Sequence, residues 1–314
     1  MAPGLKTIEE ATEIRRRILL AFELAEREND PQLVKELLTF VIVGAGPTGV
    51  ELAGAIKEIA MYTLAHDFRT VSPSDAEVIL IEGHPRVLPP FPEELSEEAK
   101  QSLLRLGVKV MTETRVTNIT RDEVTVKHGE NVSTIKTKTV LWAAGVGPTK
   151  LTRALAEATG AELDRAGRIV VEPDLSIKGH PNIYVVGDMC CYTHQDGKPL
   201  PGVAQVAVQQ GRHASKMVLR RLAGKDTGPF QYRDLGNMAT IGRGAAVAAI
   251  GKMKLHGVIA WLIWLFVHLM HLVQFQNRML VFMQWAWSYL TWNRAARLIT
   301  GGRQRYEARY EPPA

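Results

Sequence analysis

One stretch decides the fold, and it reads Phe40-Val-Ile-Val-Gly-Ala-Gly-Pro-Thr-Gly-Val-Glu-Leu-Ala-Gly54. It combines an apolar strand, a tight glycine turn and the start of a helix. The spacing is G-x-G-x-x-G: Gly44 permits the sharp turn, Gly46 leaves room for a pyrophosphate, and Gly49 lets the helix pack closely on the strand. The N-terminus of the helix adds free N–H groups and the positive end of a dipole. The stretch therefore predicts a dinucleotide site.

A second apolar strand, 78–81, ends in Glu82 and supports this interpretation. An acid at that strand end can accept hydrogen bonds from an adenosine ribose and repel a 2′-phosphate. The gap to the acid exceeds the usual spacing of about 20 residues, because the helix and the loop at 72–75 are extended. The motif alone leaves open an α/β domain that has a glycine turn and binds no nucleotide.

Composition excludes several classes of protein. The chain has 314 residues, of which 46% are hydrophobic and 23% are charged, so it can bury a sizeable core. The net charge of +5 is too diffuse to argue for nucleic acid, and no basic run is interleaved with aromatic residues. Cys190 and Cys191 are adjacent and lack the spacing of a zinc site. We therefore predict no metal, no nucleic acid and a reducing compartment.

The order of segments predicts four parts. Thr7 is a plausible helix N-cap, with Glu10 at the capping-box spacing. A strand at 183–186 leads into Gly187-Asp188, which places an acid at a strand end, and a long helix follows at 203–222. The predicted parts are a helical segment at 1–36, a dinucleotide-binding domain at 37–150, a further α/β part at 151–252, and C-terminal helices at 253–314.

The C-terminal part is unusually apolar. Residues 255–273 are apolar almost all round, residues 279–292 are more amphipathic, and five of the six tryptophans lie in these two runs. Clustered tryptophan and the arginines that follow favour the headgroup boundary, whereas ionisable groups such as His268 and His271 are costly inside a bilayer. We expect helices that lie in one leaflet; a span and a buried hairpin or dimer interface stay open. The arginines are Arg294, Arg297, Arg303 and Arg305.

Together, these features resemble the type II NADH dehydrogenases, which are single-chain NADH:quinone oxidoreductases that do not pump protons. The resemblance covers nearly all of the chain. The motifs that carry it are 4–11, 14–23, 43–54, Trp-Ala-Ala-Gly-Val at 142–146, Val-Gly-Asp at 186–188, Ala-Gln-Val-Ala-Val-Gln-Gln-Gly at 204–211, and the C-terminal tryptophan-rich run.

The resemblance implies an α/β, Rossmann-like two-dinucleotide-binding flavoprotein fold, front-truncated, with C-terminal membrane-associated helices. Its parts would be a helical segment leading out of the truncated FAD domain at 1–36, an NADH-binding domain at 37–150, the returning part of the FAD-binding domain with the quinone-site helix at 151–252, and amphipathic membrane-anchoring helices at 253–314. The implied cofactors are FAD and NADH, and the implied partners are a membrane quinone and the lipid bilayer surface. The location would be peripheral, or monotopic, on the cytoplasmic face of the plasma membrane or an equivalent respiratory membrane. A homodimer stays open.

The resemblance also implies roles for individual residues. Glu51 matches the acid near the junction of nicotinamide and flavin, and Asp188 resembles the acid that contacts the ribityl and phosphate region of the flavin. Gln205 and Gln209 match the A-Q-x-A-x-Q motif beside the flavin ring, where the quinone head enters; their i,i+4 spacing puts both amides on one helix face. The predicted catalytic residues are Glu51, Gln205 and Gln209. The predicted cofactor-binding residues are Gly44, Gly46, Pro47, Thr48, Gly49, Glu82, Ala144, Gly145, Gly187, Asp188 and Ala204.

The chain departs from the family pattern in one respect. Family members begin with a strand and a glycine motif for the adenylate half of FAD, and this chain starts after that segment. The glycines at 145–147 and 242–244 lack the third glycine of such a motif. We expect a front-truncated member that binds FAD poorly. The predicted function is FAD-dependent NADH:quinone oxidation, with two alternatives: a non-catalytic NAD(H)-binding membrane-associated fragment, or another pyridine-nucleotide flavoprotein reductase.

Overall fold

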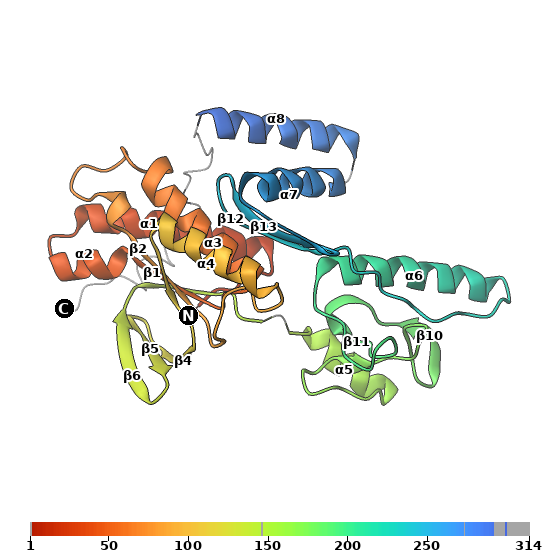
Figure 1. Ribbon diagram of the computed structural model, residues 1–314. Helices are drawn as coiled ribbons and strands as arrows, with labels where there is room; N and C mark the ends of the chain where they lie inside the picture. Colours follow the sequence, from red (N-terminus) through yellow and green to blue (C-terminus); the bar gives the residue numbers. More distant parts are fainter. Residues whose placement is uncertain (1, 146, 273, 292–298, 300–314) are drawn as a thin grey trace. The chain divides into compact units, whose positions relative to one another are not determined.

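The computed structural model describes residues 2–145, 147–272, 274–291 and 299 (Figure 1). The chain divides into two compact units. Unit 1 combines residues 1–144 with 236–314, and unit 2 comprises 145–235. This division differs from the predicted one, which assigned 236–252 to the second dinucleotide domain. Those residues belong to unit 1 because strand β12 packs against helix α3.

The centre of unit 1 is a parallel sheet of four strands in the order β3-β2-β1-β7. Val43 ends β1 and is in register with Ile81 on one side and Trp142 on the other, so three strands end at one edge. The strand after β1 lies on one side and β7 on the other, which makes that edge a topological switch point. The strands are β1 (Thr39–Val43), β2 (Glu77–Ile81), β3 (Val108–Met111) and β7 (Thr139–Trp142).

The two faces of this sheet bury different partners, because successive side chains of a strand point to opposite sides. Phe40 and Ile42 of β1 join the large core beneath the helices, whereas Val41 and Val43 face a small antiparallel sheet. That sheet consists of β4 (Thr114–Ile119), β5 (Glu123–His128) and β6 (Asn131–Lys136). Strand β6 was not predicted, because its side chains are almost all exposed and show no apolar alternation.

The first helix of unit 1 begins where the sequence predicts. Thr7 Oγ1 accepts the Glu10 N–H at 3.1 Å and the Glu10 carboxylate accepts the Thr7 N–H, which confirms the capping box. Gly107 ends the fourth helix in the left-handed conformation. The helices are α1 (Ile8–Arg27), α2 (Pro31–Leu37), α3 (Pro47–Glu58) with a π-helical extension (Ile59–Thr63), a short 3₁₀ turn (Pro73–Asp75), and α4 (Glu93–Leu106).

The last part of unit 1 is a three-stranded antiparallel sheet followed by two helices (Figure 1). Ala260 packs against this sheet, while the ring pairs Trp261–Tyr289 and Trp264–Trp285 join the two helices. No helix in the described part of the chain combines the length and apolar character that a membrane crossing needs. The arginines at 294, 297, 303 and 305 lie outside the described residues. The elements are β12 (Asn237–Gly242), β13 (Ala245–Ile250), β14 (Met253–His256), α7 (Gly257–His271) and α8 (Phe275–Thr291).

Unit 2 is smaller and built on short strands around a core that includes Tyr192 and Phe230. The strand predicted at 183–186 is shifted: β10 ends at Tyr184 and pairs antiparallel with β9, because a tight turn joins the two strands. The predicted helix at 203–222 is confirmed, with Val203 as its N-cap. The elements are α5 (Lys150–Thr159), β8 (Ile169–Val170), β9 (Ser176–Ile177), β10 (His180–Tyr184), a 3₁₀ turn (Gly187–Met189), β11 (Cys190–Cys191) and α6 (Ala204–Leu222).

Candidate functional site

The glycine turn lies at the carboxyl edge of the parallel sheet. Gly44 has φ +99°, and a Cβ built on it would lie 2.6 Å from Ala144 Cα, so only glycine fits. A Cβ on Gly49 would lie 1.8 Å from Gly44 O, which explains how closely α3 approaches the turn. A Cβ on Gly46 would meet nothing within 4 Å. The structure thus leaves open space where a pyrophosphate would approach the backbone.

The first turn of α3 supplies hydrogen-bond donors at that opening. Gly46 is the N-cap without a side-chain hydrogen bond, and Pro47 and Thr48 are exposed at the helix start. Pro47 has no N–H, and its fixed φ suits the first helical position. The N–H groups of the first turn have no acceptor within the helix. Together with the helix dipole, they favour an anion at this position.

Glu82 is next to the turn at the end of β2 and is 8% exposed. Its Oε2 accepts the Ala45 N–H at 2.7 Å, and its Oε1 accepts the His84 N–H at 2.9 Å and contacts His84 Nδ1 at 2.7 Å. Burial raises the pKa of Glu82, but these hydrogen bonds outweigh burial and the pKa is lowered overall. The edge therefore carries a fixed carboxylate beside the glycine turn, as the sequence led us to expect.

Glu51 belongs to a stripe on α3 that faces β12. Its Oε1 accepts the Thr240 N–H at 3.3 Å, and burial raises its pKa despite that hydrogen bond. One turn on, a Cβ on Gly54 would lie 1.7 Å from Ile241 O, and after another turn Glu58 accepts the Arg243 N–H. Sequence reasoning missed Gly54 and Glu58 because their partners lie more than 180 residues away. The stripe fixes α3 against the β12–β13 hairpin.

Ala144 and Gly145 follow the third strand of this edge. Ala143 N–H donates to Val43 O at 2.8 Å, and Ala144 O accepts the Trp142 indole N–H at 2.8 Å. These bonds continue the sheet beyond β7 and bring the Ala144 backbone against Gly44. Gly145 has φ +76° and begins unit 2.

In unit 2, the turn Gly187–Met189 carries the predicted acid Asp188, whose side chain is exposed. A Cβ built on Gly202 would lie 3.6 Å from Asp188 Oδ1. The carboxylate is therefore close to the loop that leads into Ala204, the exposed first residue of α6. The exposed carboxylate can accept hydrogen bonds, and the first N–H groups of α6 have no acceptor within the helix.

Gln205 and Gln209 share one face of α6, as their spacing predicts, and that face contacts the end of unit 2. Gln209 Oε1 accepts the Arg233 N–H at 3.0 Å and its Nε2 donates to Arg233 O at 2.8 Å. Gln205 Oε1 accepts the Leu235 N–H at 3.0 Å. The two amides thus contact the backbone of residues 233–235. No local sequence pattern predicts this pairing.

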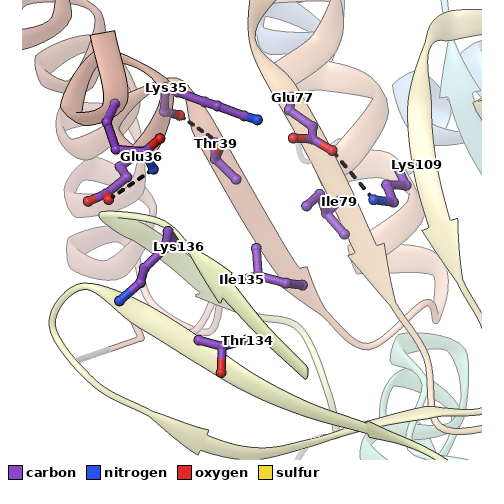
Figure 2. Close-up of a pocket in the computed structure, with 10 residues that line it drawn as sticks. Lys35, Glu36, Thr39, Glu77, Ile79, Lys109, Thr134, Ile135 and Lys136 are labelled. Atoms are coloured by element: carbon purple, nitrogen blue, oxygen red, sulfur yellow. Dashed lines mark hydrogen bonds and ion pairs between the residues drawn. The ribbon is translucent and has the colours of Figure 1, made fainter. Parts of the chain in front are cut away.

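A polar pocket of about 270 Å³ lies elsewhere in unit 1 (Figure 2). Its walls include Thr39 and Glu77, the first residues of β1 and β2, so it opens at the opposite edge from the glycine turn. Lys109 Nζ lies 3.7 Å from Glu77 Oε1, and this ion pair bounds one side of the pocket. We do not assign the nucleotide to this pocket, since no glycine turn lines it.

Two family models match this chain. Residues 2–211 match the family model for pyridine nucleotide-disulphide oxidoreductases, and residues 235–292 match the model for the NDH2 C-terminal domain. A type II NADH:quinone oxidoreductase of Mycobacterium tuberculosis is 45% identical over 303 residues, which is 95% of this chain and 64% of the relative. A second one from that organism is 44% identical over 305 residues, with the same shares.

Among solved structures, NDH2 from Plasmodium falciparum in complex with NADH has the same fold, with a TM-score of 0.85 at 19% identity. That match covers 96% of this chain and 75% of the Plasmodium chain. The chain spans about two thirds of the length of the Mycobacterium relatives, 64% in both. The expected α/β fold of a dinucleotide-binding flavoprotein is therefore confirmed.

Proposed function

The chain belongs to the type II NADH:quinone oxidoreductase family, within the pyridine nucleotide-disulphide oxidoreductases, and on that premise we propose that it oxidises NADH with a quinone as electron acceptor. The family match also confirms FAD and NADH as the expected cofactors. The chemistry that FAD supplies when bound is hydride acceptance and electron transfer to a quinone. The observation that carries the proposal is the glycine edge of unit 1, with open space at Gly46 and a carboxylate at Glu82.

For NADH, the chain provides a pyrophosphate cradle and a ribose acceptor. The open backbone at Gly46 and the first-turn N–H groups of Thr48 and Gly49 would bind the pyrophosphate. The Glu82 carboxylate would accept hydrogen bonds from the adenosine ribose and repel a 2′-phosphate. Ala144 and Gly145 would line the nicotinamide side of the turn.

For FAD, the residues of unit 2 fit the polar middle of the cofactor. Gly187, Asp188 and Ala204 would contact its ribityl and phosphate region, because the exposed Asp188 carboxylate can accept ribityl hydroxyls near the start of α6. The Ala204 end of α6 carries the positive end of the helix dipole, which suits a phosphate.

For the quinone, we propose roles for Gln205 and Gln209 of unit 2. An amide nitrogen carries two hydrogens and does not titrate, so Gln209 Nε2 can donate one to Arg233 O and the other to a quinone carbonyl. For Glu51 of unit 1 we propose a separate, proton-holding role, because burial raises its pKa and such a carboxyl keeps its proton at higher pH than an exposed one. These assignments rest on the motif match and on the burial of Glu51.

We also propose that α7 and α8 bind a bilayer surface peripherally, on the cytoplasmic face of a respiratory membrane. Both helices expose apolar residues at helical spacing, while Ala260 of α7 packs on the preceding sheet and the ring pair Trp264–Trp285 joins the two helices. Such stripes suit helices lying in the interface. The exposed residues of α7 are Val258, Ile259, Leu262, Phe266 and Met270, and those of α8 are Phe275, Met279, Leu280, Phe282, Met283 and Trp287.

The test separates the two half-reactions. The purified chain is supplied with FAD and mixed first with NADH and then with a quinone in a stopped-flow instrument, as wild type and as the double variant Gln205→Leu/Gln209→Leu. We expect flavin reduction by NADH to be nearly unchanged and reoxidation by quinone to slow about tenfold or more. A defect confined to the NADH step would refute the glutamine assignment. NADH binding without turnover in the wild type would favour the non-catalytic alternative.

A further inference from the structure

A buried glutamine of unit 2, Gln210, lies beneath the turn that carries Asp188. Its side chain is 1% exposed, and its Oε1 accepts the Gly187 N–H at 2.7 Å. Its Nε2 donates to Cys190 Sγ at 3.5 Å. The Gln210 amide thus bonds to the residue before Asp188 and to a residue two positions after it.

The chemistry of its partners fixes the orientation of this amide. The Gly187 N–H can only donate, so it requires the carbonyl end of the side chain. The amide nitrogen then requires an acceptor, and the Cys190 sulfur is one. Burial raises the pKa of Cys190 to about 12, so the thiol stays neutral and no charge enters this buried contact.

The backbone of the turn is also fixed from the side of α6. Gly187 has φ +68°, and a Cβ built there would lie 3.3 Å from the Ala207 Cβ. Ala207 and Gln210 are three residues apart and share a helix face. The turn therefore rests on α6 through one close backbone contact and one buried hydrogen bond, while Asp188 remains exposed above it.

We infer that Gln210 is a positioning residue for the flavin dinucleotide: it fixes the Gly187–Met189 backbone so that the Asp188 carboxylate is already placed for the ribityl and phosphate region. The inference rests on the proposed function, in which Asp188 contacts FAD. Fixing the turn before binding removes the ordering cost that a mobile turn would add to binding. Gln205 and Gln209 have a different task, because their amides contact residues 233–235.

The test compares two replacements of similar size in the full chain. Gln210→Met removes the acceptor and preserves most of the volume, whereas Gln210→Glu retains an acceptor for the Gly187 N–H. The matched control is Gln195→Met, since Gln195 also exchanges two hydrogen bonds with a backbone, that of Tyr232. Amide hydrogen exchange at Gly187 is followed by NMR, and FAD affinity is followed by flavin fluorescence.

We expect Gln210→Met to speed Gly187 exchange and weaken FAD binding, each by about tenfold, the effect of losing one buried hydrogen bond. Gln210→Glu should keep Gly187 exchange slow, and Gln195→Met should change neither quantity. Unchanged exchange in Gln210→Met, or faster exchange without loss of FAD affinity, would overturn the inference. If the wild type binds no FAD, in line with the weak flavin binding expected from the sequence, the proposed function of this chain fails, while the exchange comparison still decides whether Gln210 fixes the turn.

Discussion

The two glycine turns assigned to cofactors are fixed in different ways. At Gly44–Gly49, backbone touches backbone, and built Cβ atoms would collide with main-chain atoms at 2.6 Å and 1.8 Å. At Gly187, the tightest approach to a built Cβ is a side-chain methyl at 3.3 Å, and a side-chain amide supplies the fastening. The first turn requires residues without a side chain at Gly44 and Gly49. The second depends on one particular side chain placed 23 residues further on.

Mutations in the two turns should therefore differ in whether they affect folding or binding. A backbone contact cannot adapt, so enlarging a residue of the first turn should disrupt the fold unless the added atoms point into the ligand space. A side-chain contact can be replaced by water or by a neighbour, so changes around the second turn should loosen it and leave unit 2 folded.

The largest effect is expected for Gly49→Val. The new Cβ would overlap Gly44 O, and both β1 and α3 are packed in the buried core. We expect a loss of at least about 3 kcal/mol in the free energy of unfolding. Urea denaturation followed by circular dichroism measures it. A stability within about 0.5 kcal/mol of the wild type would mean that the turn is not fixed by this contact.

Gly46→Ala should separate binding from folding within the same turn. Its Cβ meets no protein atom within 4 Å, so the free energy of unfolding should stay within about 0.5 kcal/mol of the wild type. The same methyl would occupy the space assigned to the pyrophosphate, and NADH affinity should fall by about tenfold or more. Calorimetric titration with NADH decides the point. Wild-type affinity in this variant would place the nucleotide elsewhere.

Tyr192→Phe tests the dependence of unit 2 on side-chain hydrogen bonds. The buried Tyr192 hydroxyl donates to Phe230 O, and its loss leaves that carbonyl without this donor. We expect a destabilisation of about 1–2 kcal/mol. Hydrogen exchange should show it in unit 2 and leave the β1–β2 amides of unit 1 unchanged. Equal acceleration in both units would contradict the account of two separate cores.

The smallest effect is expected from the pH dependence of Glu82. Folding lowers the pKa of the Glu82 carboxyl from 4.5. Its ionised form therefore stabilises the fold above pH 4.5, and this contribution is lost as the pH falls through the pKa of the folded state. The difference in unfolding free energy between the wild type and Glu82→Gln should therefore shrink between about pH 6 and about pH 3. Glu130→Gln, which changes an exposed carboxylate paired with Lys127, is the control and should show little such dependence. If this difference in unfolding free energy grows as the pH falls, the lowered pKa of Glu82 is contradicted.

Much of unit 1 could be predicted because its signals are local. The glycine spacing, the Thr7–Glu10 capping box and the apolar strands each depend on neighbours within a few residues, and the structure contains all of them. The acid after β2 could be predicted as well, since parallel strands that end together bring their next residues to one edge. These features follow from covalent geometry and short-range hydrogen bonding.

The rest depends on partners that are distant in sequence. From the sequence, Gly54 is an ordinary small helix residue, and only the fold shows that Ile241 O lies against it. Likewise, no residue near Glu58 predicts its hydrogen bond with the Arg243 N–H. Gln210 adjoins the recognisable glutamine motif, but only the fold reveals that it faces the Gly187 turn. The polar strand β6 could not be predicted because its pairing with β5, and no apolar pattern, holds it in place.

The most direct test of the central claim is a titration of the purified wild-type chain with NADH and, separately, with NADPH, followed by nucleotide fluorescence. The account predicts saturable binding of NADH and at least about tenfold weaker binding of NADPH, because the fixed Glu82 carboxylate opposes a 2′-phosphate next to the Gly44–Gly49 turn. Equal affinities for the two nucleotides, or no NADH binding by a chain that unfolds cooperatively, would contradict it.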